Sequence, residues 1–345
     1  MPNLIVGESR RTKATINYMV HGDGPVKILF VMGLASTLDS WKMQVDAFVK
    51  LRDEQGNPTD YDSKYSICVY DNRGIGLSSS PLGRYTTEMM ALDGLELLAH
   101  LQWKQFHLIG LSMGGMIALR MSVLLISRNV GMPMDPIPSL LSLMLVVTHY
   151  GGPHSDQPET GKKMAKKLLF ALTEKKRTKK ILPMLFSKRF LSDPKNYQDA
   201  FDGIIASRKI EGGKPPIFGF LGQLHAVSRH RVKPEELQLI RDSQVPVMVM
   251  TGDEDHMVDP RNSAEMNELL QPVEYIVMPE TGHAINAERA AEFNEAMFRH
   301  VERGEARLQP MATPSTDTRS TEPVTMQSSL EQPTVLVQTQ MEIVS

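Results

Sequence analysis

The stretch Gly110-Leu111-Ser112-Met113-Gly114 lies between an apolar run and a run of helix-forming residues. The run before it, residues 106–109, is short, apolar and aromatic, which is typical of a buried strand in a parallel sheet. A serine on a sharp strand-to-helix turn requires backbone angles that bulky neighbours would obstruct, and glycine stands two positions away on either side. The sequence therefore predicts a nucleophile elbow with Ser112 at its tip.

The Gly-x-Ser-x-Gly pattern alone is a modest signal. At average residue frequencies it arises by chance in roughly one chain in ten of this length. The alternative interpretation is an ordinary turn containing glycine and serine at the end of a strand. The two interpretations differ in whether the remaining parts of a catalytic site follow in the expected order along the chain.

The composition is typical of a globular protein. The 345 residues are 41% hydrophobic and 23% charged, and the formal net charge is -2 at pH 7, which argues against bulk nucleic-acid binding. The length allows one large α/β domain or two ordinary ones. The single cysteine, Cys68, cannot form an internal disulfide and lies in an apolar run, so we expect a buried structural thiol.

Targeting signals are not visible in the sequence. No basic segment followed by an apolar run occurs at the N-terminus, and no stretch of about eighteen apolar residues occurs anywhere. The last residues match no peroxisomal or reticulum address. We therefore expect a cytoplasmic protein.

Strand and helix signals alternate along most of the chain. Residues 14–20 and 28–32 are predicted to form an antiparallel hairpin that leads into a buried strand. Mostly apolar strands that alternate with helices indicate an α/β fold, with a mainly parallel sheet covered by helices on both faces. The helix after residue 39 is expected to bury Trp41, Met43, Val45, Phe48 and Val49. Further strands are predicted at 67–70, 140–147, 245–251 and 273–278, and further helices from Thr86 or Thr87, at 262–270 and at 284–301.

Two segments depart from this alternation. Residues 151–235 are helical and polar in pattern, which predicts a helical cap inserted between two core strands. The segment 305–345 is rich in Pro, Thr, Ser, Gln and Glu and cannot bury enough apolar surface to order itself, so we predict a disordered tail. The α/β core would then comprise residues 1–150 and 236–304.

A base and an acid that could activate the serine follow later strands. A serine hydroxyl needs a base within hydrogen-bond reach, and that base needs a group to fix its tautomer. The strand ending near Thr251 runs into a loop with three candidate acids, Asp253, Asp255 and Asp259, and the next strand runs into His283. The order serine, acid, histidine is the one expected of an α/β sheet with a nucleophile elbow.

At these positions the chain resembles the α/β-hydrolase fold superfamily, in its capped branch of esterases, lactonases and similar serine hydrolases. The resemblance covers roughly residues 10–303. It rests on five ordered matches, which are residues 31–34, 71–78, 110–114, 251–255 and 282–283.

The resemblance implies a role for each matched residue. Ser112 would be the nucleophile, His283 the general base and then acid, and Asp255 the residue that orients the imidazole. The family's acid usually lies three residues beyond the glycine that closes its strand, which favours Asp255 over Asp253 and Asp259. His256, beside this acid, is expected to be only a pocket or loop residue.

The resemblance also implies an oxyanion hole made of two backbone amides. These are the N–H groups of Met113, at a helix N-terminus, and of Leu34, after Gly33. The pair Met32-Gly33 replaces the His-Gly pair common in relatives, which we interpret as a change in pocket polarity. In the family the 71–78 segment is mostly structural; it lacks the third glycine of a dinucleotide site, and neither a cofactor nor a metal is expected.

A serine at the elbow argues against haloalkane dehalogenases and epoxide hydrolases, which place Asp there. The remaining chemistry proceeds through an acyl-enzyme on a small-molecule ester, lactone, thioester or amide. The abundant methionine and aliphatic residues of the cap favour an apolar acyl group. The alternative is a receptor or scaffold with this fold and little turnover.

The cap sequence between residues 162 and 189 is strongly basic, with apolar residues interleaved. One interpretation is a pair of helices whose lysines face water while the apolar residues line the roof of the pocket. The other is peripheral contact with an anionic membrane or a negatively charged lipid or acyl carrier.

Overall fold

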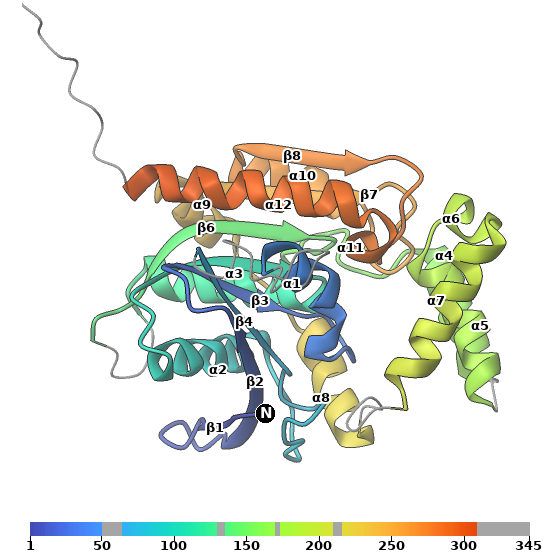
Figure 1. The fold of residues 1–345 in the computed structure, drawn as a ribbon, viewed down its shortest axis with the longest axis horizontal. Helices are drawn as coiled ribbons and strands as arrows, with labels where there is room; N and C mark the ends of the chain where they lie inside the picture. The colour runs from blue at the N-terminus through green and yellow to red at the C-terminus, as the bar shows by residue number, and fades with distance from the viewer. Residues whose placement is uncertain (50–63, 130–134, 170–172, 210–215, 309–345) are drawn as a thin grey trace, which may run out of the picture. The chain divides into compact units, whose positions relative to one another are not determined.

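In the described residues, a sheet of eight strands in the order β1-β2-β4-β3-β5-β6-β7-β8 forms the centre of the fold (Figure 1). The computed structural model describes residues 1–49, 64–129, 135–169, 173–209 and 216–308. The strands are β1 (Asn3–Val6), β2 (Ala14–His21), β3 (Val26–Val31), β4 (Tyr65–Tyr70), β5 (Gln105–Leu111), β6 (Ser139–Val146), β7 (Val247–Gly252) and β8 (Glu274–Met278).

The sheet is mainly parallel, as predicted. Strands β4, β3, β5, β6, β7 and β8 pair in parallel, whereas β1 and β2 pair antiparallel and β2 pairs antiparallel with β4. The predicted hairpin of residues 14–20 and 28–32 is wrong, because β4 lies between β2 and β3 in the sheet. The alternating residues and the turn between the two segments predicted both strands correctly, but they did not determine which strands pair in the sheet.

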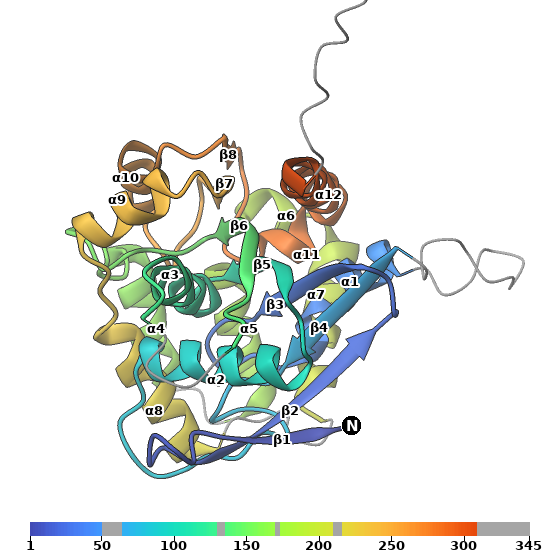
Figure 2. The same ribbon diagram turned by 90° about the vertical axis from the view of Figure 1, so that its left-hand side faces the viewer.

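Helices cover both faces of the sheet, which confirms the predicted α/β architecture. On one face, α2 (Thr87–His100), α3 (Met113–Ile126), α9 (Pro234–Asp242) and α10 (Arg261–Leu270) supply Leu95, Ile117, Leu237 and Met266 to one apolar core. On the other face, α1 (Lys42–Phe48) and α12 (Ala290–Glu305) supply Phe48 and Phe293 to a second core. Figure 2 shows α3, α9 and α10 on one side of the strands and α1 and α12 on the other.

The structure corrects two details of these helices. Met43, predicted to be buried, is 51% exposed, and its neighbour Gln44 is buried instead. A 3-10 turn at η1 (Leu38–Trp41) precedes α1 and has three residues per turn, which shifts the phase of the helix from the expected one. The helix predicted at 284–301 is two helices, α11 (Ile285–Glu288) and α12, which meet at Arg289.

The thiol of Cys68 is fully buried in β4, in agreement with the expected structural role. Burial raises its pKa far above the ordinary thiol value, so it stays protonated at neutral pH.

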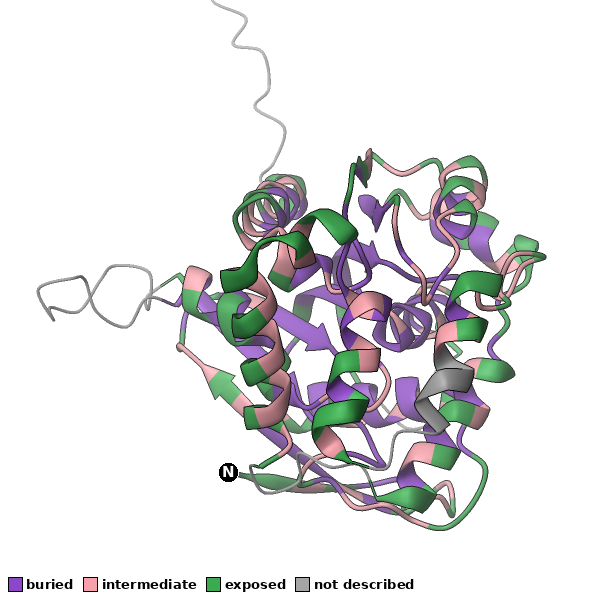
Figure 3. Cartoon of the chain, turned by 90° about the vertical axis from the view of Figure 1, so that its right-hand side faces the viewer, coloured by how far each residue is buried: buried purple, intermediate pink, exposed green. Residues whose placement is uncertain are grey.

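Between β6 and β7, the described residues form six helices. In Figure 1 the arrowheads of β6 and β8 point toward the group formed by α4 to α7, and Figure 3, seen from that side, shows exposed helices in front of the buried strands. Helix α8, in contrast, packs on the core next to the loop that follows β4, where Gly219 approaches Gly74. The helices are α4 (Glu159–Leu169), α5 (Glu174–Leu185), α6 (Lys188–Ser192), α7 (Pro194–Ser207), α8 (Ile217–Ser228) and α9.

The proposed domain boundaries stay predictions, although two elements bear on them. Helix α9 crosses the boundary at residue 235, and its Glu236 accepts a hydrogen bond of 2.7 Å from Arg120 of α3. Helical structure continues through η3 (Ala306–Leu308), beyond the predicted start of the tail at residue 305. The remainder of the predicted tail lies outside the described residues.

Candidate active site

Ser112 occupies a strained backbone position between β5 and α3. Its φ is 57° and its ψ is -123°, a region that L-residues rarely adopt. The flanking contacts hold it there: the Ser112 amide donates to the Val146 carbonyl oxygen at 2.9 Å, and the Thr148 hydroxyl donates to the Ser112 carbonyl oxygen at 2.8 Å. The serine side chain is thereby directed to the carboxyl edge of the sheet.

The glycines around Ser112 are required by close backbone contacts. A Cβ atom at Gly110 would lie 2.4 Å from the Gly114 carbonyl oxygen, and one at Gly114 would lie 2.0 Å from the Val31 carbonyl oxygen. Both distances are too short for any side chain. The packing thus explains both glycines of the motif.

Asp255 and His283 come together although 28 residues separate them. The Asp255 Oδ2 atom and the His283 Nδ1 atom are 2.7 Å apart, and both residues are buried. The Asp255 Oδ1 atom accepts the amides of Met257 at 2.7 Å and Val258 at 2.9 Å. A carboxylate can only accept a hydrogen bond, so this contact assigns an N–H to His283 Nδ1; in the neutral imidazole, Nε2 is then the acceptor.

The two rival acids make other contacts. Asp259 pairs with Arg261, with 2.5 Å between Oδ2 and Nη2, and Asp253 accepts the Thr281 amide at 3.3 Å. His256 Nδ1 lies 3.3 Å from the Thr160 hydroxyl of α4. Of the three candidate acids, only Asp255 contacts His283 through a hydrogen bond of the described residues.

Ser112 and His283 lie at the same edge of the sheet. The strands that precede Ser112, Asp255 and His283 run parallel, so their carboxyl ends meet there. Among the described residues, no hydrogen bond joins the Ser112 hydroxyl to His283. Serine–base hydrogen bonds are often long in unliganded enzymes and shorten when substrate binds.

The loop after β3 approaches the serine closely. A Cβ atom at Gly33 would lie 3.5 Å from Ser112 Oγ, so the backbone of this loop borders the hydroxyl. Within the described ranges, neither the Leu34 amide nor the Met113 amide has a hydrogen-bond partner. Both N–H groups are therefore available to a ligand, and the Met113 amide also lies at the N-terminus of α3.

The Asp71–Ser78 segment is structural, as expected. Asp71 accepts the Leu38 amide at 2.8 Å and the Leu77 amide at 3.0 Å, which ties two loops together. Arg73 forms a buried two-pronged ion pair with Asp93, with distances of 2.6 and 2.7 Å.

Two buried histidines lie near the elbow without joining the candidate triad. His149, three residues after β6, has its pKa lowered to about 4 by burial. His230 lies with its ring centroid 5.7 Å from that of His149, and its Nδ1 is 2.9 Å from the Thr87 hydroxyl. The contact joins His230 to the first turn of α2.

Two residues next to the site were not anticipated from the sequence. Glu288 accepts the Gly282 amide at 3.0 Å, directly before His283, and Gln223 accepts the Ala35 amide at 2.9 Å, directly after Leu34. Their partners are distant in sequence except for Gly282, so no local pattern could have indicated them.

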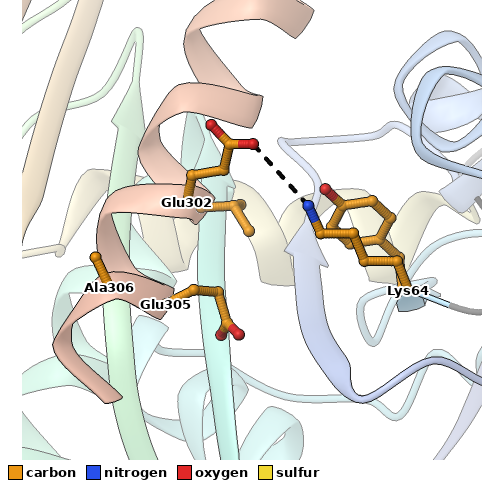
Figure 4. A pocket seen from close by; sticks show the side chains of 6 residues that line it. Lys64, Glu302, Glu305 and Ala306 are labelled. Atoms are coloured by element: carbon orange, nitrogen blue, oxygen red, sulfur yellow. Dashed lines mark ion pairs between the residues drawn. The ribbon is translucent and has the colours of Figure 1, made fainter. Parts of the chain in front are cut away.

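A surface hollow of about 320 Å³ lies away from this site. It is formed where β4 begins and α12 ends, whereas Ser112 follows the carboxyl end of a strand. Figure 4 shows Lys64 across the hollow from Glu302, with 3.9 Å between their charged atoms. The lining residues are Lys64, Tyr65, Val301, Glu302, Glu305 and Ala306.

Neither a metal site nor a membrane span is found in the described parts of the chain. No three His, Cys, Asp or Glu side chains come together there as ligands of a metal ion would. No helix in those parts combines the length and apolar character needed to cross a bilayer.

A comparison with known protein families identifies the family of the chain. Residues 19–296 match the profile of the alpha/beta hydrolase family. The chain belongs to this family.

Individual relatives within the family are distant. The 3-oxoadipate enol-lactonase 2 of Acinetobacter baylyi is 34% identical over 103 residues, which are 29% of this chain and 33% of that protein. The chain thus spans about a third of that relative. RutD of the same organism, named for carbamate hydrolysis, is 22% identical over 79% of this chain and 91% of its own length. A thermophilic esterase from Thermogutta terrifontis has the same fold, with a TM-score of 0.62 and 20% identity over 88% of this chain and 99% of its own.

Proposed function

We propose that this alpha/beta hydrolase is a serine hydrolase that acts through an acyl-enzyme, with Ser112, His283 and Asp255 as its triad. The observation that carries the proposal is the 2.7 Å hydrogen bond between Asp255 and His283, at the sheet edge where Ser112 is presented on a strained turn. A buried carboxylate that accepts two backbone amides and one imidazole is arranged to hold the base in a single tautomer.

The proposed reaction uses one proton carrier. His283 Nε2 takes the hydroxyl proton as Ser112 Oγ attacks the acyl carbon, and the Leu34 and Met113 amides donate to the developing oxyanion. The leaving group departs with the proton from His283. A water molecule, deprotonated by the same nitrogen, then attacks the acyl-serine ester; His283 returns the proton to Ser112 Oγ as the acyl–oxygen bond breaks, and the carboxylic acid is released. Asp255 stays ionised throughout and stabilises the imidazolium.

We assign the substrate to carboxylic esters, lactones or thioesters with a largely apolar acyl group. Relatives named as an enol-lactonase and an esterase support this class. The backbone of Phe186 contacts Gly282 beside His283, and the Phe186 ring stacks on Phe190 with 4.8 Å between centroids. This aromatic pair, in the helices beside the loop of His283, supports an apolar group on the substrate.

An active-site probe tests the proposal directly. A fluorophosphonate should label the wild type and leave Ser112→Ala unlabelled, and hydrolysis of p-nitrophenyl esters should fall by several orders of magnitude in the same variant. Parallel assays with esters of graded chain length, lactones and acyl thioesters would rank the substrates. Absence of labelling in folded wild type would overturn the proposal in favour of a ligand receptor.

We also propose that the basic cap segment contacts anionic lipid. Lys175, Lys176 and Lys179 of α5 are exposed, which supports an electrostatic contact, and part of the segment lies outside the described residues. Sedimentation with anionic vesicles at low salt should retain the protein in the pellet. The variant with all three lysines replaced by Gln should stay in the supernatant, and equal recovery of both in the supernatant would contradict the contact.

A further inference from the structure

Helix α8 belongs to the inserted segment but docks directly on the core. Its buried face carries small residues: a Cβ atom at Gly219 would lie 2.2 Å from the Gly74 carbonyl oxygen, and one at Gly222 would lie 2.6 Å from the Tyr85 ring. The backbone of α8 is therefore in direct contact with the core at both glycines, where a side chain would not fit. This docking brings a side chain of α8 against the loop after β3.

That side chain is Gln223, which is completely buried. Its Oε1 atom accepts the Ala35 amide at 2.9 Å, and its Nε2 atom donates to the Arg73 carbonyl oxygen at 2.9 Å. One partner only donates and the other only accepts, so the orientation of the amide group is determined. Gln223 therefore connects the loop after β3, through Ala35, with the loop after β4, through Arg73.

The loop held by Gln223 is strained next to the candidate oxyanion donor. Ala35 has a φ of 56°, a left-handed conformation that is costly for alanine. Its amide belongs to the peptide group that follows Leu34. Anchoring this peptide group restricts the rotation of Leu34, whose own N–H follows Gly33, the residue that approaches the Ser112 hydroxyl.

We propose that Gln223 is a positioning residue for the oxyanion hole. It holds the Leu34-Ala35 peptide group so that the Leu34 amide faces the reacting carbonyl oxygen, and it links that alignment to the docking of α8. This inference rests on the proposed serine hydrolase function. Because the oxyanion exists only in the transition state, loss of Gln223 should lower kcat and leave KM almost unchanged.

Three variants separate this role from a general structural one. Gln223→Met has similar length and loses both hydrogen bonds. Gln223→Glu keeps an acceptor for the Ala35 amide, and in its protonated form it also regains a donor for the Arg73 carbonyl. His225→Leu is the matched control, because it removes the contact of 3.0 Å between the same helix and the Tyr85 carbonyl oxygen.

The expected pattern is specific. Gln223→Met should lose about 10- to 100-fold in kcat with KM within about twofold, less than the loss on deleting an oxyanion donor outright. Its affinity for an alkyl boronic acid, which forms a tetrahedral anionic adduct on serine, should fall by a similar factor. Relative to wild type, Gln223→Glu should regain activity as pH falls, and His225→Leu should keep its kcat despite lower stability.

Several results would overturn the proposal. These are an unchanged kcat or boronate affinity in Gln223→Met, or an equal loss of kcat in His225→Leu. If Gln223→Met fails to fold, the pH dependence of the Gln223→Glu to wild-type activity ratio decides, and a flat ratio rejects the role. If wild type shows neither probe labelling nor hydrolysis, the proposed function fails. Hydrogen exchange at the Ala35 amide then still tests whether Gln223 holds the loop. This amide should exchange faster in Gln223→Met or Gln223→Glu, whichever folds, than in wild type.

Discussion

The Glu288 carboxylate accepts hydrogen bonds from both the backbone amide and the hydroxyl group of Ser187. The amide contact is 3.1 Å. Ser187 caps α6, and the same carboxylate accepts the Gly282 amide at 3.0 Å, one residue before His283. The Ala284 amide, on the other side of His283, donates to the Leu185 carbonyl oxygen at 2.8 Å. Helix α5 and the N-cap of α6 are thus bonded to the loop on both sides of the proposed base.

Replacing Glu288 should weaken both the fold and the reaction. Glu288→Ala leaves three buried or half-buried donors without their acceptor, so we expect a loss of about 2 to 3 kcal/mol in the free energy of unfolding. Displacement of His283 should also lower kcat by on the order of tenfold or more. Urea unfolding and ester hydrolysis measure the two effects. Glu292→Ala, which removes a surface pair with Arg289, should change stability by less than about 0.5 kcal/mol, and equal effects of the two variants would contradict this account.

Asp255→Asn should abolish most activity while the protein stays folded. The asparagine oxygen would face the Met257 and Val258 amides, and its NH2 group would face His283 Nδ1, which would move the imidazole proton to Nε2. A base protonated at Nε2 cannot accept the serine proton, so kcat should fall about 10⁴-fold. Steady-state kinetics on an activated ester measure the loss. Asp259→Asn, a change at the rival acid, should stay within about twofold of wild type, and the reverse ranking would reassign the acid.

Stability should fall as the pH decreases below about 6.5. Burial lowers the pKa of His149 to about 4 and that of His300 to about 3, and it lowers the pKa of His230 well below the ordinary value. Above pH 6.5 these side chains are neutral whether the chain is folded or not. Below it the unfolded chain binds protons that the folded chain cannot, so each histidine should remove about 1.4 kcal/mol per pH unit down to its own folded pKa.

The His300→Gln variant isolates one of these contributions. His300 Nε2 donates to the Leu143 carbonyl oxygen at 3.0 Å, and a glutamine amide supplies a similar donor without titrating. Urea unfolding at pH 7.5, 5.5 and 4.5 should give a shallower pH slope for the variant than for wild type. Parallel slopes would show that His300 takes up its proton in the folded protein.

The buried ion pair of Arg73 should be essential for stability. Both side chains are 2% exposed, and Arg10 also reaches Asp93 at 2.8 Å. Asp93→Ala would leave the Arg73 guanidinium buried without its partner, at a cost of about 3 to 5 kcal/mol. Glu96→Ala loses a partly exposed partner of Arg10 and the acceptor of the Gly7 amide, and should cost about 1 to 2 kcal/mol in the same chemical denaturation experiment. A loss below about 1 kcal/mol for Asp93→Ala would contradict the burial of this charge.

Local signals predicted most of the sheet and the turn at Ser112. The strands of the core are apolar runs. Residues 110 and 114 are glycines because a side chain at either position would clash with backbone atoms close to the elbow. Asp255 and His283, predicted to act together, are hydrogen-bonded, because parallel strands deliver their following loops to one edge. The catalytic roles of these residues stay predictions.

What the sequence could not indicate depends on partners far away in the chain. The contact between Gln223 and Ala35 spans 188 residues, and that between Ser187 and Glu288 spans 101. A glutamine inside an apolar helix has the same local pattern whether it faces water or a core loop. The mispredicted hairpin has the same origin, because β4, which separates β2 from β3, begins at Tyr65, long after both.

The backbone conformation of Ser112 also has a consequence for the stability of the fold. Glycine adopts a φ of 57° with a ψ of -123° far more readily than serine does, so Ser112→Gly should relieve strain and raise the melting temperature while removing the hydroxyl. Drift toward greater stability alone would therefore favour glycine at this position. A serine at this position therefore costs stability, and backbone strain of this kind is concentrated at functional sites.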